Sequence, residues 1–274
     1  MKVRSVVLVA ALAALASALW AQDGRGLDVR VRELGGQYAT VGKQYVALIA
    51  IDRYRSWPGL KSPVKDATEI KEILGRRYFV DEFLELYDAD ATKAGINRLF
   101  RSLVERTRPE DSVLIYYAGH GYLDPLSRTG FWIPVDGGMD VDAQENWIPN
   151  VQIRGIIGSM KARHVALISD SCFSGDILNP TRGRLEDITS EYFKAAYQRV
   201  SRQVLTSGAS ESVPDASAFA QQLKLALEGN RQPYLDPLML YTDVRLGVSG
   251  TRRGGASFCS CAMRPRPQAC PRPR

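Results

Sequence analysis

The chain has 274 residues, of which 45% are hydrophobic and 24% are charged, and its mean hydropathy is −0.19. These values predict one globular core and exclude a disordered protein. The net charge of +6 does not indicate a nucleic-acid partner, because seven arginines lie in residues 245–274 and Lys2 and Arg4 lie at the N-terminus. Without these nine cations, residues 22–244 carry a charge of about −3 and no basic stripe. We therefore exclude nucleic-acid binding as the main function.

Residues 1–21 have the features of a signal peptide. Lys2 and Arg4 precede an apolar run of 16 residues, and small residues at 16–18 and at Ala21 offer cleavage sites. The run is shorter than the roughly 20 residues that a membrane-spanning helix needs. We expect an exported protein, periplasmic or extracellular. The alternative is an uncleaved segment that holds the chain at the membrane.

After a polar leader at residues 22–43, apolar runs typical of buried strands alternate with amphipathic helices. The strands are expected at 45–51, 83–87, 112–118, 164–169 and 203–207, with a possible hairpin around 131–136. The helices are expected after Ser62-Pro63 and at 92–106, 151–160, 217–229 and 237–248. Unbroken apolar strands separated by helices predict an α/β domain at residues 44–248, with a mainly parallel sheet covered by helices on both faces.

The last 26 residues, 249–274, differ in composition from the rest of the chain. They are dense in Arg, Pro and Cys and have no hydrophobic period. We expect this tail to form neither a strand nor a helix, and to be disordered or an aberrant end. Its three cysteines without a nearby histidine make a poor metal site.

Two strand ends carry unusual residues, YYAGHG at 116–121 and ISDSCFSGD at 168–176. The carboxyl ends of parallel strands lie at one edge of a sheet, so His120 and Cys172 are expected within reach of each other. An imidazole can take the proton of a thiol and activate it as a nucleophile. The main-chain N–H groups of Gly121 and Cys172 are candidates for an oxyanion hole. Taken singly, each residue has an ordinary alternative: Cys172 as a packed core residue and His120 as part of a turn.

With these motifs the sequence resembles the caspase-like cysteine peptidases, particularly the metacaspase-like members of bacteria. The resemblance covers about residues 44–248 and includes YVALIAIDRY, LKSPVKDA, YYAGHG, DSCFSGD and SAFAQQLKLAL. It implies a six-stranded caspase fold with flanking helices and hydrolysis of peptide bonds through a thioester. It also implies a dyad with Cys172 as nucleophile, His120 as general acid and base, and Gly121 at the oxyanion position.

Asp66 and Asp170 are the candidates for substrate binding. Asp66 begins the helix after the first strand and Asp170 precedes Cys172, so strand order would bring both to the edge beside the nucleophile. In the metacaspases that the sequence resembles, the matching acids line the pocket for the residue before the scissile bond. Two carboxylates in a partly dry pocket favour a cation, which predicts cleavage after Arg or Lys. The alternatives are a favourable charge at a helix N-terminus for Asp66 and a local turn for Asp170.

No metal or other cofactor is expected. The acidic cluster that binds calcium in several metacaspases has no clear match, although Asp136, Asp140 and Asp142 are nearby, so calcium activation is an alternative without a clear site. The expected partners are protein or peptide substrates, and the oligomeric state is left open. The alternative from another functional class is a catalytically silent caspase-fold scaffold, and another thiol hydrolase is a third possibility.

Overall fold

The computed structural model describes residues 30–34, 37–171, 197–207, 217–232, 234–251 and 260–262. Its centre is a six-stranded sheet with the order β11-β10-β9-β5-β3-β4. Five strands are parallel: β3 (Gln44–Ala50), β4 (Glu82–Tyr87), β5 (Ser112–Ala118), β9 (His164–Asp170) and β10 (Ser201–Thr206). The predicted α/β fold with a mainly parallel sheet is confirmed, and the five expected strands match these to within a few residues.

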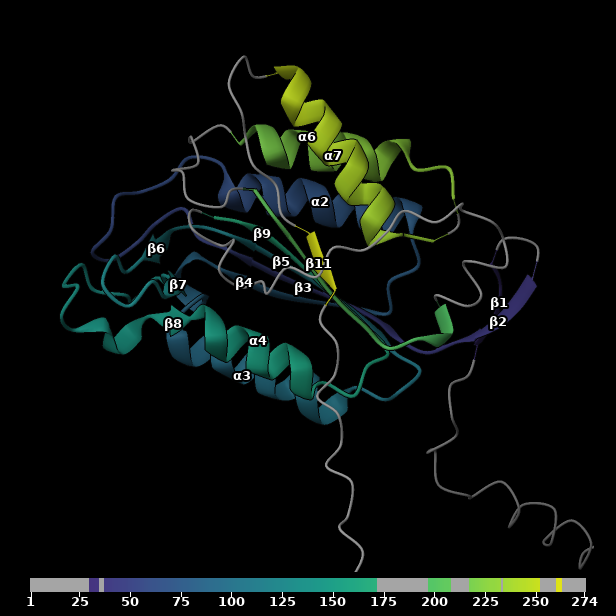
Figure 1. Cartoon of the computed structure of the whole chain (residues 1–274), viewed down its shortest axis with the longest axis horizontal. Helices are drawn as coiled ribbons and strands as arrows, with labels where there is room; N and C mark the ends of the chain where they lie inside the picture. The colour runs from purple at the N-terminus through teal and green to yellow at the C-terminus, as the bar shows by residue number, and fades with distance from the viewer. Residues whose placement is uncertain are drawn as a thin grey trace, which may run out of the picture.

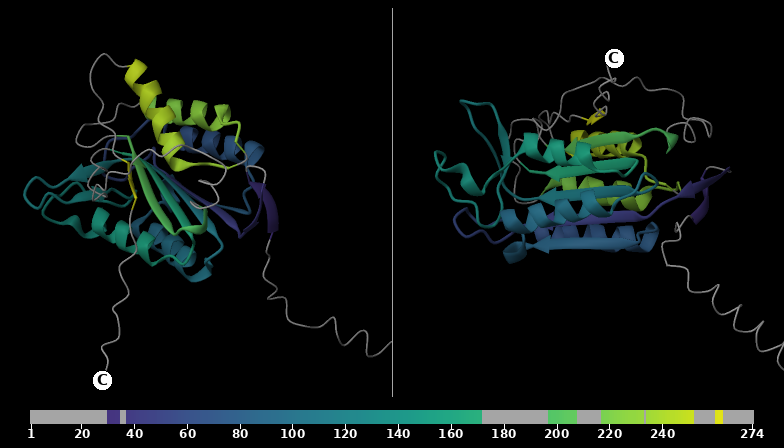
Figure 2. Two further views of the ribbon diagram at one scale, coloured as in Figure 1. Left: turned by 45° about the vertical axis from the view of Figure 1, so that its right-hand side comes forward. Right: turned by 90° about the horizontal axis from the view of Figure 1, so that it is seen from below.

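Helices cover both faces of the sheet (Figure 1). One face carries α2 (Pro63–Arg77), α6 (Ala218–Gly229) and α7 (Pro237–Thr251), and the other carries α3 (Lys93–Arg106) and α4 (Asn150–Ser159). The view from below in Figure 2 shows α3 and α4 lying along the strands. Within the described residues, no helix has the length and apolar content to cross a bilayer.

The helices begin where the sequence offers caps. Pro63 occupies the first turn of α2, where its missing N–H costs nothing. The hydroxyl of Thr92 accepts a hydrogen bond from the Gly95 N–H at the start of α3, and the hydroxyl of Ser217 accepts one from the Ala220 N–H at the start of α6. These bonds satisfy donors that have no partner within the helix.

Successive residues of a strand face opposite sides of the sheet, and β5 shows the consequence for the site. Tyr117 belongs to the core beneath α3 and α4, whereas Tyr116 and Ala118 belong to the core beneath α2, α6 and α7. The two cores are separated by the sheet. The carboxyl edge therefore has two sides, and each is built by different helices and loops.

A second, three-stranded antiparallel sheet extends from the carboxyl edge. It consists of β6 (Gly121–Leu123), β7 (Gly130–Trp132) and β8 (Ile148–Pro149). The possible hairpin around 131–136 is thus part of a larger unit. At the opposite end of the main sheet lies the hairpin of β1 (Arg30–Leu34) and β2 (Gln37–Val41), inside the region 22–43 that the sequence predicted only as a polar leader.

One expectation about the tail is wrong. Residues 249–274 were expected to form no strand, but β11 (Ser260–Ala262) pairs antiparallel with β10. An edge strand is held by backbone hydrogen bonds and needs no hydrophobic period of its own, which is why the composition gave no signal. Helix α7 also continues to Thr251, past the expected end at 248. Residues 252–259 and 263–274, like the proposed signal peptide at 1–21, lie outside the described residues.

Candidate active site

The two strand ends that the sequence singled out are neighbours in the sheet. Strands β5 and β9 pair in parallel, with Ala118 opposite Asp170. The pairing continues beyond the strands, because the Gly119 N–H donates to the Asp170 carbonyl at 3.3 Å. His120 and Ser171 therefore lie just beyond the ends of two neighbouring strands, at one edge of the sheet. Cys172 comes directly after Ser171 and lies outside the described residues.

Uncharged partners fix the position of His120. Its backbone N–H donates to the Tyr54 hydroxyl at 2.7 Å, and its ring Nε2 lies 2.8 Å from the Pro58 carbonyl oxygen. Because a carbonyl can only accept, Nε2 carries the proton in this contact and Nδ1 is the basic nitrogen of the neutral ring. The rings of Tyr54 and Trp57 pack on the imidazole, with centroids 4.7 and 5.4 Å from it.

Gly119 is required by the close approach of Tyr54. A Cβ at this position would lie 2.5 Å from the Tyr54 hydroxyl oxygen. That hydroxyl is buried, and burial raises the pKa of Tyr54 well above its usual range. The Tyr117 hydroxyl donates to the His120 carbonyl at 2.8 Å, so the main chain of His120 is held on both sides. The run of apolar residues stops at Gly119 because a side chain there would displace the group that holds the histidine.

Gly121 is the first residue of β6, directly after His120. It lies at the same edge because it follows His120 directly, and it pairs with Trp132 of β7. Its assigned place in an oxyanion hole stays a prediction, because the other assigned donor is the N–H of Cys172.

Asp170 lies on the opposite face of the carboxyl edge from Tyr117, and burial has the largest effect on its pKa. The residue is 7% exposed, and its Oδ1 has no hydrogen-bond partner among the described residues. Burial raises the pKa of Asp170 to about 6, with the nearby hydroxyls of Ser217 and Ser207 acting in the opposite direction and the charge of Asp66 adding to the rise. A buried carboxylate without a cation is costly, so this position favours a positively charged ligand.

Asp66 is near enough to Asp170 for their charges to interact. It lies in the first turn of α2 with its side chain 10% exposed, so it faces the sheet. Both acids also act on Tyr116, whose pKa is raised by burial and then by the charges of Asp170 and Asp66. The Tyr116 hydroxyl is a second buried polar atom without a partner among the described residues. The structure thus brings the two predicted acids together on one face.

A third group, Lys224 of α6, was missed from sequence. Its Nζ lies 2.7 Å from Asp66 Oδ1 and also contacts Glu69. The signal was present in the helical pattern, because Lys224 falls four residues after Ala220 and three before Leu227, both of which are buried. Pro58, Tyr54 and Trp57 were missed as well, since they lie in an irregular segment with no periodic pattern.

Comparisons with known proteins decide the family. Residues 43–269 match the model of the caspase domain of peptidase family C14. The chain belongs to this family. It is similar to Metacaspase-1 of Eremothecium gossypii, at 29% identity over an alignment of 174 residues that covers 58% of this chain and 38% of that protein. The chain thus spans well under half the length of that relative.

The fold comparison agrees with the family. The crystal structure of a protein from Geobacter sulfurreducens is similar, with a TM-score of 0.56 and 15% identity over 80% of this chain and 93% of that one. At this identity the likeness shows the fold alone. The resemblance to caspase-like peptidases inferred from the sequence motifs is therefore confirmed at the level of family and fold.

Two of the three acids considered for calcium, Asp136 and Asp140, accept local hydrogen bonds. Asp136 Oδ1 accepts a hydrogen bond from the Lys93 N–H at the start of α3 at 2.8 Å. Asp140 Oδ1 accepts one from the Asp142 N–H at 3.0 Å. No group of three metal-binding side chains occurs among the residues that the structure describes.

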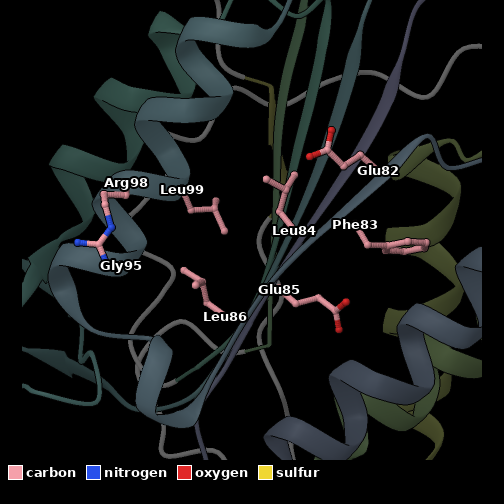
Figure 3. Close-up of a pocket in the computed structure, with 8 residues that line it drawn as sticks. All are labelled: Glu82, Phe83, Leu84, Glu85, Leu86, Gly95, Arg98 and Leu99. Carbon is pink, nitrogen blue, oxygen red and sulfur yellow. The ribbon is translucent and has the colours of Figure 1, made fainter.

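A pocket of about 340 Å³ lies beside the edge strand β4, away from the residues discussed above (Figure 3). Leu84 and Leu86 point towards Leu99 of α3, whereas Phe83 and Glu85 point to the opposite face of the strand. The predicted site residues of the caspase domain are not among those that line it. It has no part in the proposed chemistry.

Proposed function

We propose that this chain is a cysteine endopeptidase that hydrolyses peptide bonds with a dyad of His120 and Cys172. The observation that carries the proposal is the placement of His120 at the end of β5, beside the end of β9 that leads into Cys172. Membership in the caspase-domain family supports the same chemistry. The Tyr54 hydroxyl, for which Gly119 leaves space, and the Pro58 carbonyl hold His120 more firmly than an ordinary turn histidine requires.

The chemistry follows from the orientation of the imidazole. With its proton on Nε2, bonded to the Pro58 carbonyl, the ring takes the thiol proton of Cys172 on Nδ1. The thiolate then attacks the carbonyl carbon of the substrate, and main-chain N–H groups, including that of Gly121, stabilise the oxyanion. The imidazolium returns the proton to the leaving amine as the C–N bond breaks and a thioester remains. The same ring deprotonates a water molecule that hydrolyses the thioester.

The acidic side of the edge supports cleavage after Arg or Lys. Asp170 offers a buried carboxylate oxygen without a partner among the described residues, and the same holds for the Tyr116 hydroxyl, on whose pKa Asp170 acts. A guanidinium or ammonium group would satisfy both the charge and the hydrogen bonds. Arginine is expected to be preferred because its planar fork can bind two acceptors at once.

As part of this proposal, residues 1–21 direct export to the periplasm or the exterior, and the partners are protein or peptide substrates. No cofactor enters the reaction.

A labelled peptidyl-arginine chloromethylketone tests the proposal. Covalent capture of the wild type, lost in Cys172→Ala and in His120→Ala, is the expected result. The matched probe with aspartate in place of arginine should label weakly. A folded wild type that neither reacts with the arginine probe nor cleaves a peptide library would instead indicate the catalytically silent scaffold.

A further inference from the structure

Lys224 lies on the same side of the carboxyl edge as Asp66 and Asp170, and two carboxylates hold its ammonium group there. Its side chain is 18% exposed, and its Nζ contacts Asp66 at 2.7 Å and also Glu69. Burial disfavours the charge of Lys224, but the hydrogen bonds to the two carboxylates outweigh it and raise the pKa. The ammonium group is therefore charged at neutral pH. It occupies an oxygen of one of the two acids proposed to bind the substrate.

Packing of the helices does not by itself explain this contact. The apolar residues Leu223 and Leu227 of α6 are buried in the same core as Ile70 and Leu74 of α2. Farther from the carboxyl edge, a second ion pair joins the same two helices, between Arg76 and Glu228 at 2.7 Å. That pair is exposed, at 62% and 49%, as expected of a surface contact. The Lys224 side chain is less exposed than that of Arg76, at 18% against 62%, and it lies at the end of α2 that faces the proposed pocket.

The two acids differ in their contacts with cations. Asp66 has a cation on Oδ1, whereas Oδ1 of Asp170 has no partner among the described residues. A basic side chain of a substrate would enter a pocket where one carboxylate is already neutralised. It would also experience repulsion from the ammonium group of Lys224.

We propose that Lys224 is a specificity-determining residue that competes with the basic side chain of the substrate for Asp66. This inference rests on the proposed cleavage after Arg or Lys and adds to it. By keeping Asp66 neutralised, Lys224 leaves Asp170 as the main acceptor. Lys224 thereby weakens the binding of basic substrates without touching the reacting atoms, so its effect is on KM and not on kcat.

Lys224→Met removes the charge and keeps most of the apolar stem, and it should lower KM for a peptidyl-arginine substrate roughly fivefold or more, with kcat nearly unchanged. Asp66→Asn should change KM in the opposite direction, because Lys224 then repels the substrate without its partner. The double variant should lie between the two single variants. A merely structural salt bridge would give two destabilised proteins without opposite changes in KM.

Arg76→Met is the matched control, since it breaks the other ion pair between α2 and α6 and should leave KM at the wild-type value. Lys224→Gln, measured in parallel, covers the case in which the methionine variant does not fold. Equal KM values for the wild type and the folded Lys224 variants would overturn the role of Lys224 while leaving cleavage after Arg intact. A wild type that cleaves no arginine or lysine peptide would overturn the proposed function itself.

Discussion

The two sides of the carboxyl edge are built on different physical principles. On one side His120 is held by a tyrosine hydroxyl, a backbone carbonyl and two aromatic rings, all of them uncharged. On the other side the buried acids Asp66 and Asp170 and the partly buried Lys224 form an arrangement dominated by charge. Uncharged contacts fix geometry and depend little on pH or salt. Buried charges create a preference for a ligand charge and respond to pH.

The largest expected effect is on the histidine side. Cys172→Ala and His120→Ala should each lower kcat on a peptide substrate by about three orders of magnitude or more, because each removes one half of the proposed dyad. Neither change should unfold the protein, since His120 is not part of the buried core. Burst kinetics and thermal melts measure both quantities. If Cys172→Ala kept most of the activity, the assignment of the dyad would be wrong.

On the acidic side, Asp170→Asn should lower kcat/KM for arginine substrates by about a hundredfold, since it removes the charge from the buried carboxylate that we propose binds the substrate cation. The loss should appear in KM and be selective for basic residues. Profiling of a peptide library with both proteins measures it. A preference of the wild type for aspartate before the scissile bond would contradict the role of the acids.

The same substitution should have an effect on stability with a defined dependence on pH. The pKa of Asp170 is about 6 in the folded protein and 3.8 as the ordinary value, so the folded state binds this proton more tightly than the unfolded chain. The contribution of Asp170 to stability is therefore present below pH 4 and is lost as the pH rises through about 6.

Asp170→Asn should then raise the free energy of unfolding by about 1–3 kcal/mol at pH 8, with the gain shrinking towards zero near pH 3. Denaturant unfolding at several pH values measures this difference. The exposed Asp243→Asn serves as control. A stability difference for Asp170→Asn that did not vary between pH 4 and 8 would show that ionisation of the Asp170 carboxyl group does not destabilise the folded state.

The smallest expected effect is on kcat, after loss of the hydroxyl group that positions the main chain of His120. Tyr54→Phe leaves the His120 N–H without its acceptor, which costs about 1–2 kcal/mol and corresponds to a loss of about tenfold in kcat if the ring shifts. The pH profile of kcat should keep its shape, because no charge changes. Tyr122→Phe, which removes a hydroxyl from the neighbouring aromatic cluster, is the control. A shifted pH profile for Tyr54→Phe would show that the hydroxyl tunes the imidazole as well as positioning it.

Much of the fold followed from local patterns. The unbroken apolar runs of β3, β5 and β9 identified parallel strands, because a strand buried on both faces has no polar alternation. Parallel strands end at one edge of the sheet, and this rule placed YYAGHG beside the start of DSCFSGD. His120 and Cys172 in these motifs are 52 residues apart in sequence. The three-residue strand β11 could not be predicted, since backbone pairing at an edge leaves no trace in the composition of the tail.

The sequence by itself determined the family, the sheet and the candidate residues His120, Cys172, Asp66 and Asp170, because each stands at the end of an element whose period is visible in the chain. Only the tertiary structure decided what surrounds them. Pro58 reaches His120 from an irregular loop, and Lys224 reaches Asp66 across 158 residues of sequence. Such contacts depend on how loops cross the edge and how α6 packs against α2. Periodicity reports which face of an element is buried, but not which side chain of another element it meets there.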